Sequence, residues 1–305
     1  MKPSSQPSSR LVAIANPAAG RGRAARLLPR LRDALAARGI TTLHVTSGPG
    51  EERDIAEAAA RDGAGTVLAL GGDGTWGNVA RGILAGGGGA RLALAAAGTG
   101  NDLAFASGIP AHDIDVAVAT ALGAGERRID VGAADGVHFV NCLGFGFDAE
   151  VVRAIGRVTW ARGHAVYLAT AVRQLFTFPA LRARVTVGDD ESLIAERQHL
   201  MLVVSNGARF GGGFLIAPAA RNDDGALDVV RVGDATPWRR AVLLSGASRG
   251  RHVHAREVSM ARATSLSFDF DAPPIFQADG ELHQATSARV VVQCLTGALR
   301  LAVPV

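Results

Sequence analysis

Residues 66–78, with the sequence TVLALGGDGTWGN, join an apolar run, a glycine-rich turn and the start of a helical pattern. The run from Thr66 to Leu70 predicts a buried strand, and the glycines after it let the backbone approach a ligand without strain. A helix N-terminus then offers unpaired N–H groups, which favour an anion such as phosphate. Asp73 would repel that phosphate unless a cation lay between them. The stretch therefore predicts a Mg²⁺-nucleotide site; the alternative is an ordinary turn with Asp73 facing solvent.

Two further glycine-bearing turns follow apolar runs in the first part of the chain. Residues 16–20 (NPAAG) come after Leu11–Ala15, and residues 98–102 (GTGND) come after Leu92–Ala96. Such runs alternate with helical patterns as far as Ala124, which predicts βαβ units and a parallel sheet. Because ligands of these sheets bind beyond the carboxyl ends of the strands, we expect the three turns to converge at one edge.

The pattern changes near residue 127, where strand-like segments separated by Gly and Asp turns replace the alternation. They predict an antiparallel sandwich or barrel-like second domain, with one short helix at Pro237–Ser245. Arg289–Cys294 and Ala298–Val303 are predicted as separate strands. We place the domains at residues 10–126 and 127–305.

Composition narrows the possible chemistry. Lys2 is the only lysine, so the chain lacks the lysine that a P-loop, a protein kinase or a Schiff-base enzyme requires. Any phosphate must be held by backbone N–H groups, arginine or metal. The net charge of +4 fits an anionic ligand or membrane face. No basic stripe interleaved with aromatic residues indicates a nucleic-acid partner, and none is expected.

The first ten residues, MKPSSQPSSR, are polar and lack the apolar centre of a signal peptide, which predicts a disordered lead-in over residues 1–9. No uncharged apolar stretch is long enough to cross a bilayer. Cys142 and Cys294 lie far apart and form no CxxC motif, which favours a reducing cytoplasm over a disulfide or thiolate metal site.

Taken together, the motifs resemble the diacylglycerol kinase catalytic-domain superfamily, which includes bacterial soluble lipid kinases, sphingosine kinases and ceramide kinases. The matching strings, in the family's order, are NPAAG at 16–20, GGDGT at 71–75, GTGND at 98–102, GFGFDAEV at 144–151, NGARFGGGFLIAPAARNDDGALDV at 206–229 and DGE at 279–281. GGDGT alone is shared with NAD kinases and phosphofructokinases. GTGND followed by the strings at 206–229 and 279–281 is specific to lipid kinases. The resemblance covers nearly the whole chain.

The resemblance implies an α/β plus all-β fold: an N-terminal three-layer α/β nucleotide-binding domain and a C-terminal antiparallel β-sandwich domain, with the active site in the cleft between them. The last strands, about residues 288–305, are candidates to return to the first domain. The implied cofactors are ATP and Mg²⁺, and the implied reaction transfers phosphate to diacylglycerol or a related lipid alcohol.

The resemblance also implies roles for individual residues. Those that would contact ATP are Asn16, Pro17, Ala18, Ala19, Gly20, Thr46, Gly72, Asp73, Gly74, Thr75, Trp76, Gly77, Asn78, Thr99, Asn101 and Asp102. Asp73 and Asp102 would organise Mg²⁺, directly or through water. Glu281 would act as the general base, with Asp73 as the rival candidate. Asp224 would bind a structural Mg²⁺ with main-chain carbonyls near Arg221 and Ala226, although some relatives have a small polar residue in place of Arg221.

One departure concerns the residues after GGDGT. The family's usual GGDGTxNE is GGDGTWGN here, so Gly77 and Asn78 replace Asn-Glu and an acidic residue is missing. Asn78 can hydrogen-bond a ribose or a phosphate but cannot bring a charge to a metal. This pair is the only support for a catalytically silent nucleotide or lipid sensor. An NAD kinase-like enzyme is the other alternative, and it leaves GTGND and the second-domain strings unexplained.

The implied lipid acceptor sits in a membrane, so we expect a cytoplasmic protein with peripheral association to the inner face of the membrane. Residues 151–178 form a basic amphipathic pattern and are a candidate surface for that approach. The alternative is a helix that covers the sandwich core. The sequence does not name the lipid, and it leaves open whether the protein forms a homodimer.

Overall fold

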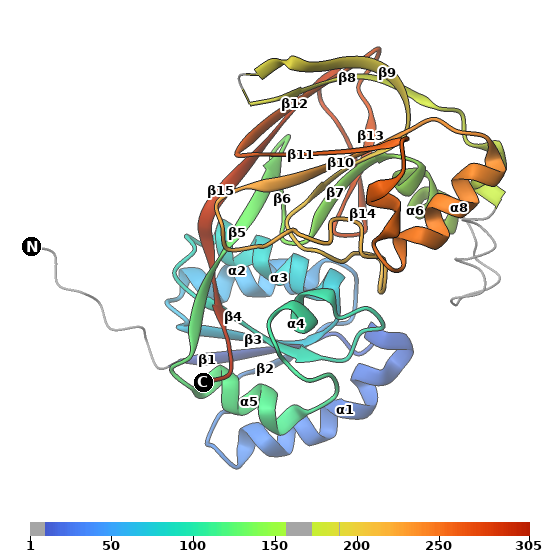
Figure 1. Ribbon diagram of the computed structural model, residues 1–305. Coiled ribbons are helices and arrows are strands. Elements are labelled where there is room, and N and C mark those ends of the chain that lie inside the picture. The colour runs from blue at the N-terminus through green and yellow to red at the C-terminus, as the bar shows by residue number, and fades with distance from the viewer. Residues whose placement is uncertain (1–9, 157–172, 189) are drawn as a thin grey trace, which may run out of the picture. The chain divides into compact units, whose positions relative to one another are not determined.

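A computed structural model describes residues 10–156, 173–188 and 190–305 (Figure 1). The predicted lead-in, residues 1–9, and most of the predicted amphipathic segment at 151–178 lie outside these residues. The chain forms two compact units. One contains the described residues up to Asp130 together with Gly297–Val305, and the other contains Val131–Thr296. The units divide between Asp130 and Val131, inside the strand Glu126–Ala134. The first domain predicted from the sequence ends at residue 126, which is the first residue of this strand.

The first unit is built on a parallel sheet. Its strands are β1 (Leu11–Ala15), β2 (Leu43–Val45), β3 (Thr66–Gly71) and β4 (Arg91–Ala96), in the order β2-β1-β3-β4. The end of β15 (Arg289–Ala302) adds to β4 in parallel. Strands β1 and β3 are buried along their whole length, which explains why their sequences are almost continuously apolar.

Helices cover both faces of this sheet. Helix α1 (Ala19–Ala36) packs with α5 (Ile114–Leu122) on one face, and α2 (Glu51–Arg61) packs with α3 (Asp73–Ala85) on the other (Figure 1). The short helix α4 (Asp102–Ala106) follows β4. The predicted three-layer α/β architecture is therefore confirmed.

The second unit is antiparallel, as predicted. Its strands are β5 (Glu126–Ala134, which begins in the first unit), β6 (Val137–Phe139), β7 (Cys142–Gly146), β8 (Leu181–Val187), β9 (Asp190–Ser205), β10 (Leu227–Gly233), β11 (Val258–Ala263), β12 (Ser265–Phe270), β13 (Ile275–Ala278), β14 (Glu281–Gln284) and the first part of β15. The strand order is β14-β13-β7-β9-β8-β12-β15, and β10 joins β9 to β11. The strands predicted at Arg289–Cys294 and Ala298–Val303 are one continuous strand, because Gly297 accommodates a positive φ within it.

Strand β9 separates two apolar clusters of the second unit. Leu202 and Val204 face a cluster that includes Phe145, Phe268 and Phe276. Leu200 and Val203 face the other cluster, to which α6 (Phe147–Gly156) and α8 (Pro237–Ala247) contribute. The predicted helix at Pro237–Ser245 is thus present and ends two residues later. No helix in the described part of the chain is long and apolar enough to cross a membrane.

Candidate active site

The turns after β1, β2 and β3 meet at the carboxyl edge of the parallel sheet. Asn16, which follows β1, donates from Nδ2 to Oε1 of Glu52 at 2.6 Å and to Oγ1 of Thr75 at 3.2 Å. These two acceptors lie in the first turns of α2 and α3, so one amide group joins three segments of the chain. Thr46, at the end of β2, is buried and its N–H donates to the carbonyl of Ala15 at 2.9 Å.

Close backbone approach explains why these turns contain glycine. A Cβ on Gly20 would lie 1.8 Å from the carbonyl oxygen of Ala97, and one on Gly98 would lie 2.6 Å from Cα of Gly72. Both distances are far below van der Waals contact, so no other residue fits without a backbone shift. Arg23 fixes the same region by donating to the carbonyl of Gly98 at 2.7 Å. The structure therefore brings the 16–20, 71–75 and 98–102 turns together.

Asp73 and Asp102 form a pair of neighbouring carboxylates at this edge. Burial and the charge of Asp102 raise the pKa of Asp73 to about 6. The backbone N–H of Leu103 donates to Oδ1 of Asp73 at 3.2 Å, so Asp73 faces the α4 turn and is not a solvent-facing turn residue. A cation between the two carboxylates would relieve their repulsion. The donor set thus fits Mg²⁺, although the described residues contain no group of three or more His, Cys, Asp or Glu side chains placed to hold a metal ion.

Two buried oxygens at this edge have no hydrogen-bond partner within the described residues: Oε2 of Glu52 and Oδ1 of Asn101. Asn101 holds a φ of +56° and donates from Nδ2 to the carbonyl of Gly98. Open acceptors suit a metal ion or a ligand donor such as a hydroxyl or amino group. Glu52 was not singled out in the sequence; its only signal was its place in the acidic first turn of α2.

In the second unit, the turn that contains Glu281 is held by its neighbours. Asp279 accepts hydrogen bonds from the N–H groups of Val140, Asn141 and Cys142 at 2.8, 2.9 and 3.1 Å. The N–H of Gly280 donates to Oε1 of Gln277 at 2.9 Å. Glu281 begins β14 and is partly exposed. This arrangement fixes the backbone from which the Glu281 carboxylate projects.

The residues of the predicted structural metal site make contacts with neighbouring residues. Asp224 forms an ion pair with Arg262 and accepts from the N–H of Ala226 at 3.3 Å. Arg221 pairs with Asp223 at 3.2 Å. An arginine thus pairs with the Asp224 carboxylate in this structure, and the Mg²⁺ site with Arg221 and Ala226 stays a prediction.

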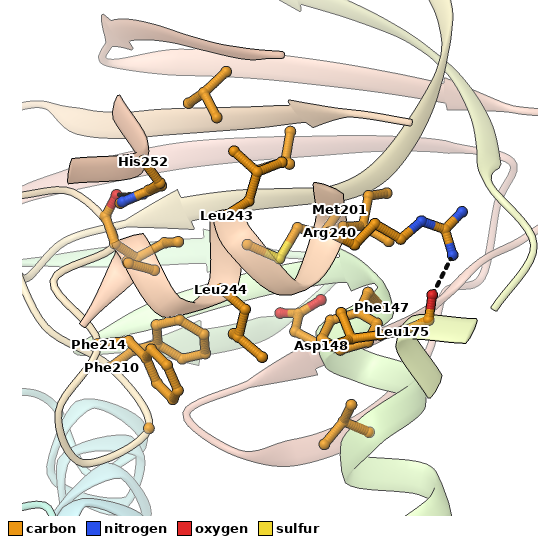
Figure 2. Close-up of a pocket in the computed structure, with 17 residues that line it drawn as sticks. Phe147, Asp148, Leu175, Met201, Phe210, Phe214, Arg240, Leu243, Leu244 and His252 are labelled. Atoms are coloured by element: carbon orange, nitrogen blue, oxygen red, sulfur yellow. Dashed lines mark hydrogen bonds between the residues drawn. The ribbon is translucent and has the colours of Figure 1, made fainter. Parts of the chain in front are cut away.

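An apolar cavity of about 110 Å³ lies in the second unit between α6, β9 and α8 (Figure 2). Asp148, Arg240 and His252 are its polar lining residues among side chains such as Phe147, Phe210 and Leu243. Burial raises the pKa of Asp148 to about 6 and lowers the pKa of His252. Arg240 donates to the carbonyls of Leu175 and Phe178 and to Asp234, while its buried Nε has no hydrogen-bond partner within the described residues.

Asp148 connects the cavity to the turn of Glu281. Its Oδ2 accepts from Nε2 of Gln277 at 3.1 Å, and Oε1 of the same glutamine accepts from Gly280. Asp148 also lies directly over Gly144, where a Cβ would be 1.6 Å from its carboxylate oxygen. The string GFGFDAEV at 144–151 therefore places a buried carboxyl group one glutamine away from the DGE turn.

Two family models together match almost the whole described chain. The diacylglycerol kinase catalytic domain matches residues 10–134, and the YegS C-terminal NAD kinase beta sandwich-like domain matches residues 141–303. The chain belongs to the diacylglycerol kinase and YegS-like lipid kinase family.

Individual family members support this assignment. A probable lipid kinase YegS-like from Pseudomonas aeruginosa is 38% identical over 201 residues, which are 65% of this chain and 56% of that protein. Diacylglycerol kinase from Mycobacterium tuberculosis is 27% identical over 187 residues, 60% of either chain. The matches thus span less than two thirds of these relatives. A crystal structure of a diacylglycerol kinase from Bacillus anthracis shares the fold, with a TM-score of 0.76, 24% identity and 97% coverage of both chains.

In this chain, the side chains that follow GGDGT have defined places in the structure. Trp76 is fully buried and donates from Nε1 to the carbonyl of Ala69 at 3.1 Å, so its side chain belongs to the core. Asn78 is buried, and its Oδ1 accepts from Arg81 at 3.0 Å. Thr99, by contrast, is exposed at the turn after β4.

Proposed function

We propose that the protein is an ATP- and Mg²⁺-dependent lipid kinase that transfers the γ-phosphate of ATP to the hydroxyl of diacylglycerol or a related lipid alcohol. The observation that carries the lipid assignment is the apolar cavity whose buried Asp148 is linked through Gln277 to the DGE turn. An NAD kinase-like enzyme would need a polar site for its dinucleotide acceptor, and a cavity with this lining suits an acyl chain better.

The glycine turns of the first unit would bind the nucleotide. The first N–H groups of α3, at Asp73, Gly74 and Thr75, suit the phosphates, because a helix N-terminus leaves them without partners inside the helix and the space around Gly74 is open. Mg²⁺, when bound between Asp73 and Asp102, would neutralise phosphate charge. Arg21, exposed with a φ of +58° in the same turn, is placed to add positive charge where the chain has no lysine to do so.

Glu281 is our candidate for the group that accepts the proton from the lipid hydroxyl. Phosphoryl transfer depends mainly on positioning and charge neutralisation, so the base needs only to reach the acceptor oxygen. Asp279 and Gln277 would act as positioning residues for this turn. Asp73 is the rival base, and its raised pKa suits proton transfer near neutral pH.

The acceptor would come from a membrane, so we propose peripheral association with the inner face of the cytoplasmic membrane. The cavity would take part of one acyl chain while the hydroxyl end lay toward the DGE turn. Its small volume suits a chain segment and not a whole lipid.

An assay with a panel of acceptors tests the proposal. The purified protein is incubated with labelled ATP and Mg²⁺ and either diacylglycerol, monoacylglycerol, sphingosine, ceramide or NAD. We expect a labelled phospholipid from at least one glycerolipid and no labelled NADP. A folded protein that labels NAD alone would establish the NAD kinase alternative, and nucleotide binding without any product would establish the silent sensor.

A further inference from the structure

Helix α8 carries apolar side chains on two opposite sides. Leu243 and Ala247 are buried and line the cavity (Figure 2), whereas Trp238 and Val242 are 76% and 57% exposed. The exposed pair is spaced by four residues, so the two side chains lie one turn apart on the same side of the helix. A helix at the surface of a soluble protein normally places polar residues on its outer side. The apolar outer side of α8 therefore suggests a surface that binds a partner.

A third exposed apolar residue extends this surface. Phe176, which is 47% exposed, packs edge-on against Trp238 with the ring centroids 5.7 Å apart. Two aromatic rings and a valine therefore form one continuous apolar patch. Aromatic residues that are exposed together in this way are typical of surfaces that bury them on binding.

Positive charge lies beside the patch. A groove along α8 is lined by Val242, Arg249, Arg251 and His254 among others. Arg249 and Arg251 are exposed and form no ion pair within the described residues. Glu257, the acidic residue nearby, is neutralised by Arg239 at 2.8 Å and Arg256 at 3.2 Å. The groove is therefore basic as well as next to the aromatic pair.

We infer that the α8 face, defined here as Phe176, Trp238, Val242, Arg249 and Arg251, docks on an anionic phospholipid bilayer. Tryptophan prefers the headgroup level of a membrane, and arginines near the surface are attracted by anionic lipids. A bilayer satisfies both parts of the face, whereas an apolar protein partner would satisfy only the patch. The inference deepens the proposed function, on which it rests for the idea that a lipid enters the cavity behind α8.

Co-sedimentation with lipid vesicles tests the inference directly. The wild type should bind vesicles of phosphatidylcholine with phosphatidylglycerol and should bind pure phosphatidylcholine much more weakly. The double variants W238S/V242S and R249Q/R251Q should each lower binding to the anionic vesicles by about tenfold or more. All the altered side chains are exposed, so circular dichroism should show an unchanged fold.

Matched variants on the first unit provide the controls. R26Q/R32Q removes two exposed arginines from α1, and L122S removes a leucine that is 44% exposed at the end of α5. Both should bind anionic vesicles as the wild type does. Equal binding by all variants, or no binding by the wild type, would overturn the inference. So would a wild-type dimer that W238S/V242S dissociates, because a second copy would then be the occupant of this face.

Kinase assays separate this inference from the proposed function. With a short-chain diacylglycerol dissolved as monomers, W238S/V242S and R249Q/R251Q should retain wild-type turnover and lose it only on vesicles. If the variants bind vesicles in the expected pattern but no lipid is phosphorylated, the α8 face is supported as the membrane-binding surface and the proposed kinase activity is excluded. If both variants are fully active on vesicles, the α8 face is excluded as the membrane-binding surface and the proposed kinase activity is supported.

Discussion

Asp148 is a buried carboxyl group whose ionisation opposes folding. Its pKa is raised to about 6 by burial, while the hydrogen bond from Gln277 lowers it in part. Because the pKa is higher in the folded protein than in the unfolded chain, the folded state retains a proton between about pH 4 and pH 6. The free energy of unfolding therefore falls as pH rises through this window. Above it, the folded protein bears the full free-energy cost of an ionised, buried Asp148.

Replacing Asp148 with asparagine removes this cost. A shift of about two pH units corresponds to about 3 kcal/mol, so Asp148→Asn should stabilise the protein by up to about that amount at pH 8 and by much less near pH 4. Urea unfolding at both pH values measures the difference. Asp269→Asn, at a partly exposed carboxyl group, is the control and should change stability little at either pH. A gain from Asp148→Asn that does not depend on pH would contradict the argument.

Gly98 tests the close approach of two turns. Gly98→Ala would place Cβ 2.6 Å from Cα of Gly72, and because the obstacle is backbone, a turn must move. We expect a loss of about 1–3 kcal/mol in the free energy of unfolding. Gly74→Ala is the matched control, since a Cβ at Gly74 would have no atom within 4 Å and alanine favours the helix. Chemical denaturation compares the two, and equal stabilities would show that the turns are not in contact.

Glu281 tests the assignment of the base. Glu281→Gln keeps the shape of the side chain and removes its ability to accept a proton. We expect turnover of the lipid acceptor to fall by at least about 100-fold with little change in the KM for ATP. Asp73→Asn run in parallel distinguishes the rival. Turnover within about tenfold of the wild type for Glu281→Gln would exclude Glu281 as the base.

At the scale of elements, the DGE turn depends on a carboxylate held by three backbone N–H groups. Asp279→Ala would leave the N–H groups of Val140, Asn141 and Cys142 without this acceptor. We expect the free energy of unfolding to fall by about 2–4 kcal/mol and turnover to fall more than the affinity for ATP. Amide hydrogen exchange would report the change, with faster exchange at residues 140–142 and slow exchange retained in β9. Unchanged exchange at 140–142 would contradict this role of Asp279.

Much of the fold of the first unit could be predicted from the pattern of strands and turns in its sequence. The apolar runs at Leu11–Ala15 and Thr66–Leu70 read as buried strands because both faces of a parallel strand are covered. The convergence of the 16–20, 71–75 and 98–102 turns followed from the same reasoning, since each turn comes after the carboxyl end of a strand. The antiparallel second unit was predicted from its turn-rich pattern.

Other features could not be predicted, because they depend on contacts between side chains that are far apart in the sequence. The bond between Asn16 and Glu52 spans 36 residues, and no local pattern indicates that these two side chains face each other. The cavity needs the combined shapes of α6, β9 and α8. The outer face of α8 reads in the sequence as an ordinary short helix, because exposure is decided by what packs around it.

At the scale of the molecule, the chain returns to its first unit at the end. Gly297 donates from its N–H to Oδ1 of Asp130 at 2.7 Å, and Leu299, Leu301 and Ala302 are fully buried. Arg300 pairs with Glu126 through bonds of 2.7 and 2.8 Å. The strand β15, which pairs with both β4 and β5, therefore supplies the first unit with a strand and with part of its core, although the residues are distant in sequence from most of that unit.

A truncation tests how far the first unit depends on this segment. Ending the chain after Thr296 removes three buried residues and uncovers β4, which should cost several kcal/mol of a total stability of about 5–15 kcal/mol. Ending it after Val303 removes only the exposed Pro304 and Val305 and serves as the control. Amide exchange should accelerate in β3 and β4 of the shorter chain while β9 stays protected, and ATP binding should be lost. Equal protection of β4 in both truncated chains would mean that β1 to β4 hold the first unit together without the returning strand.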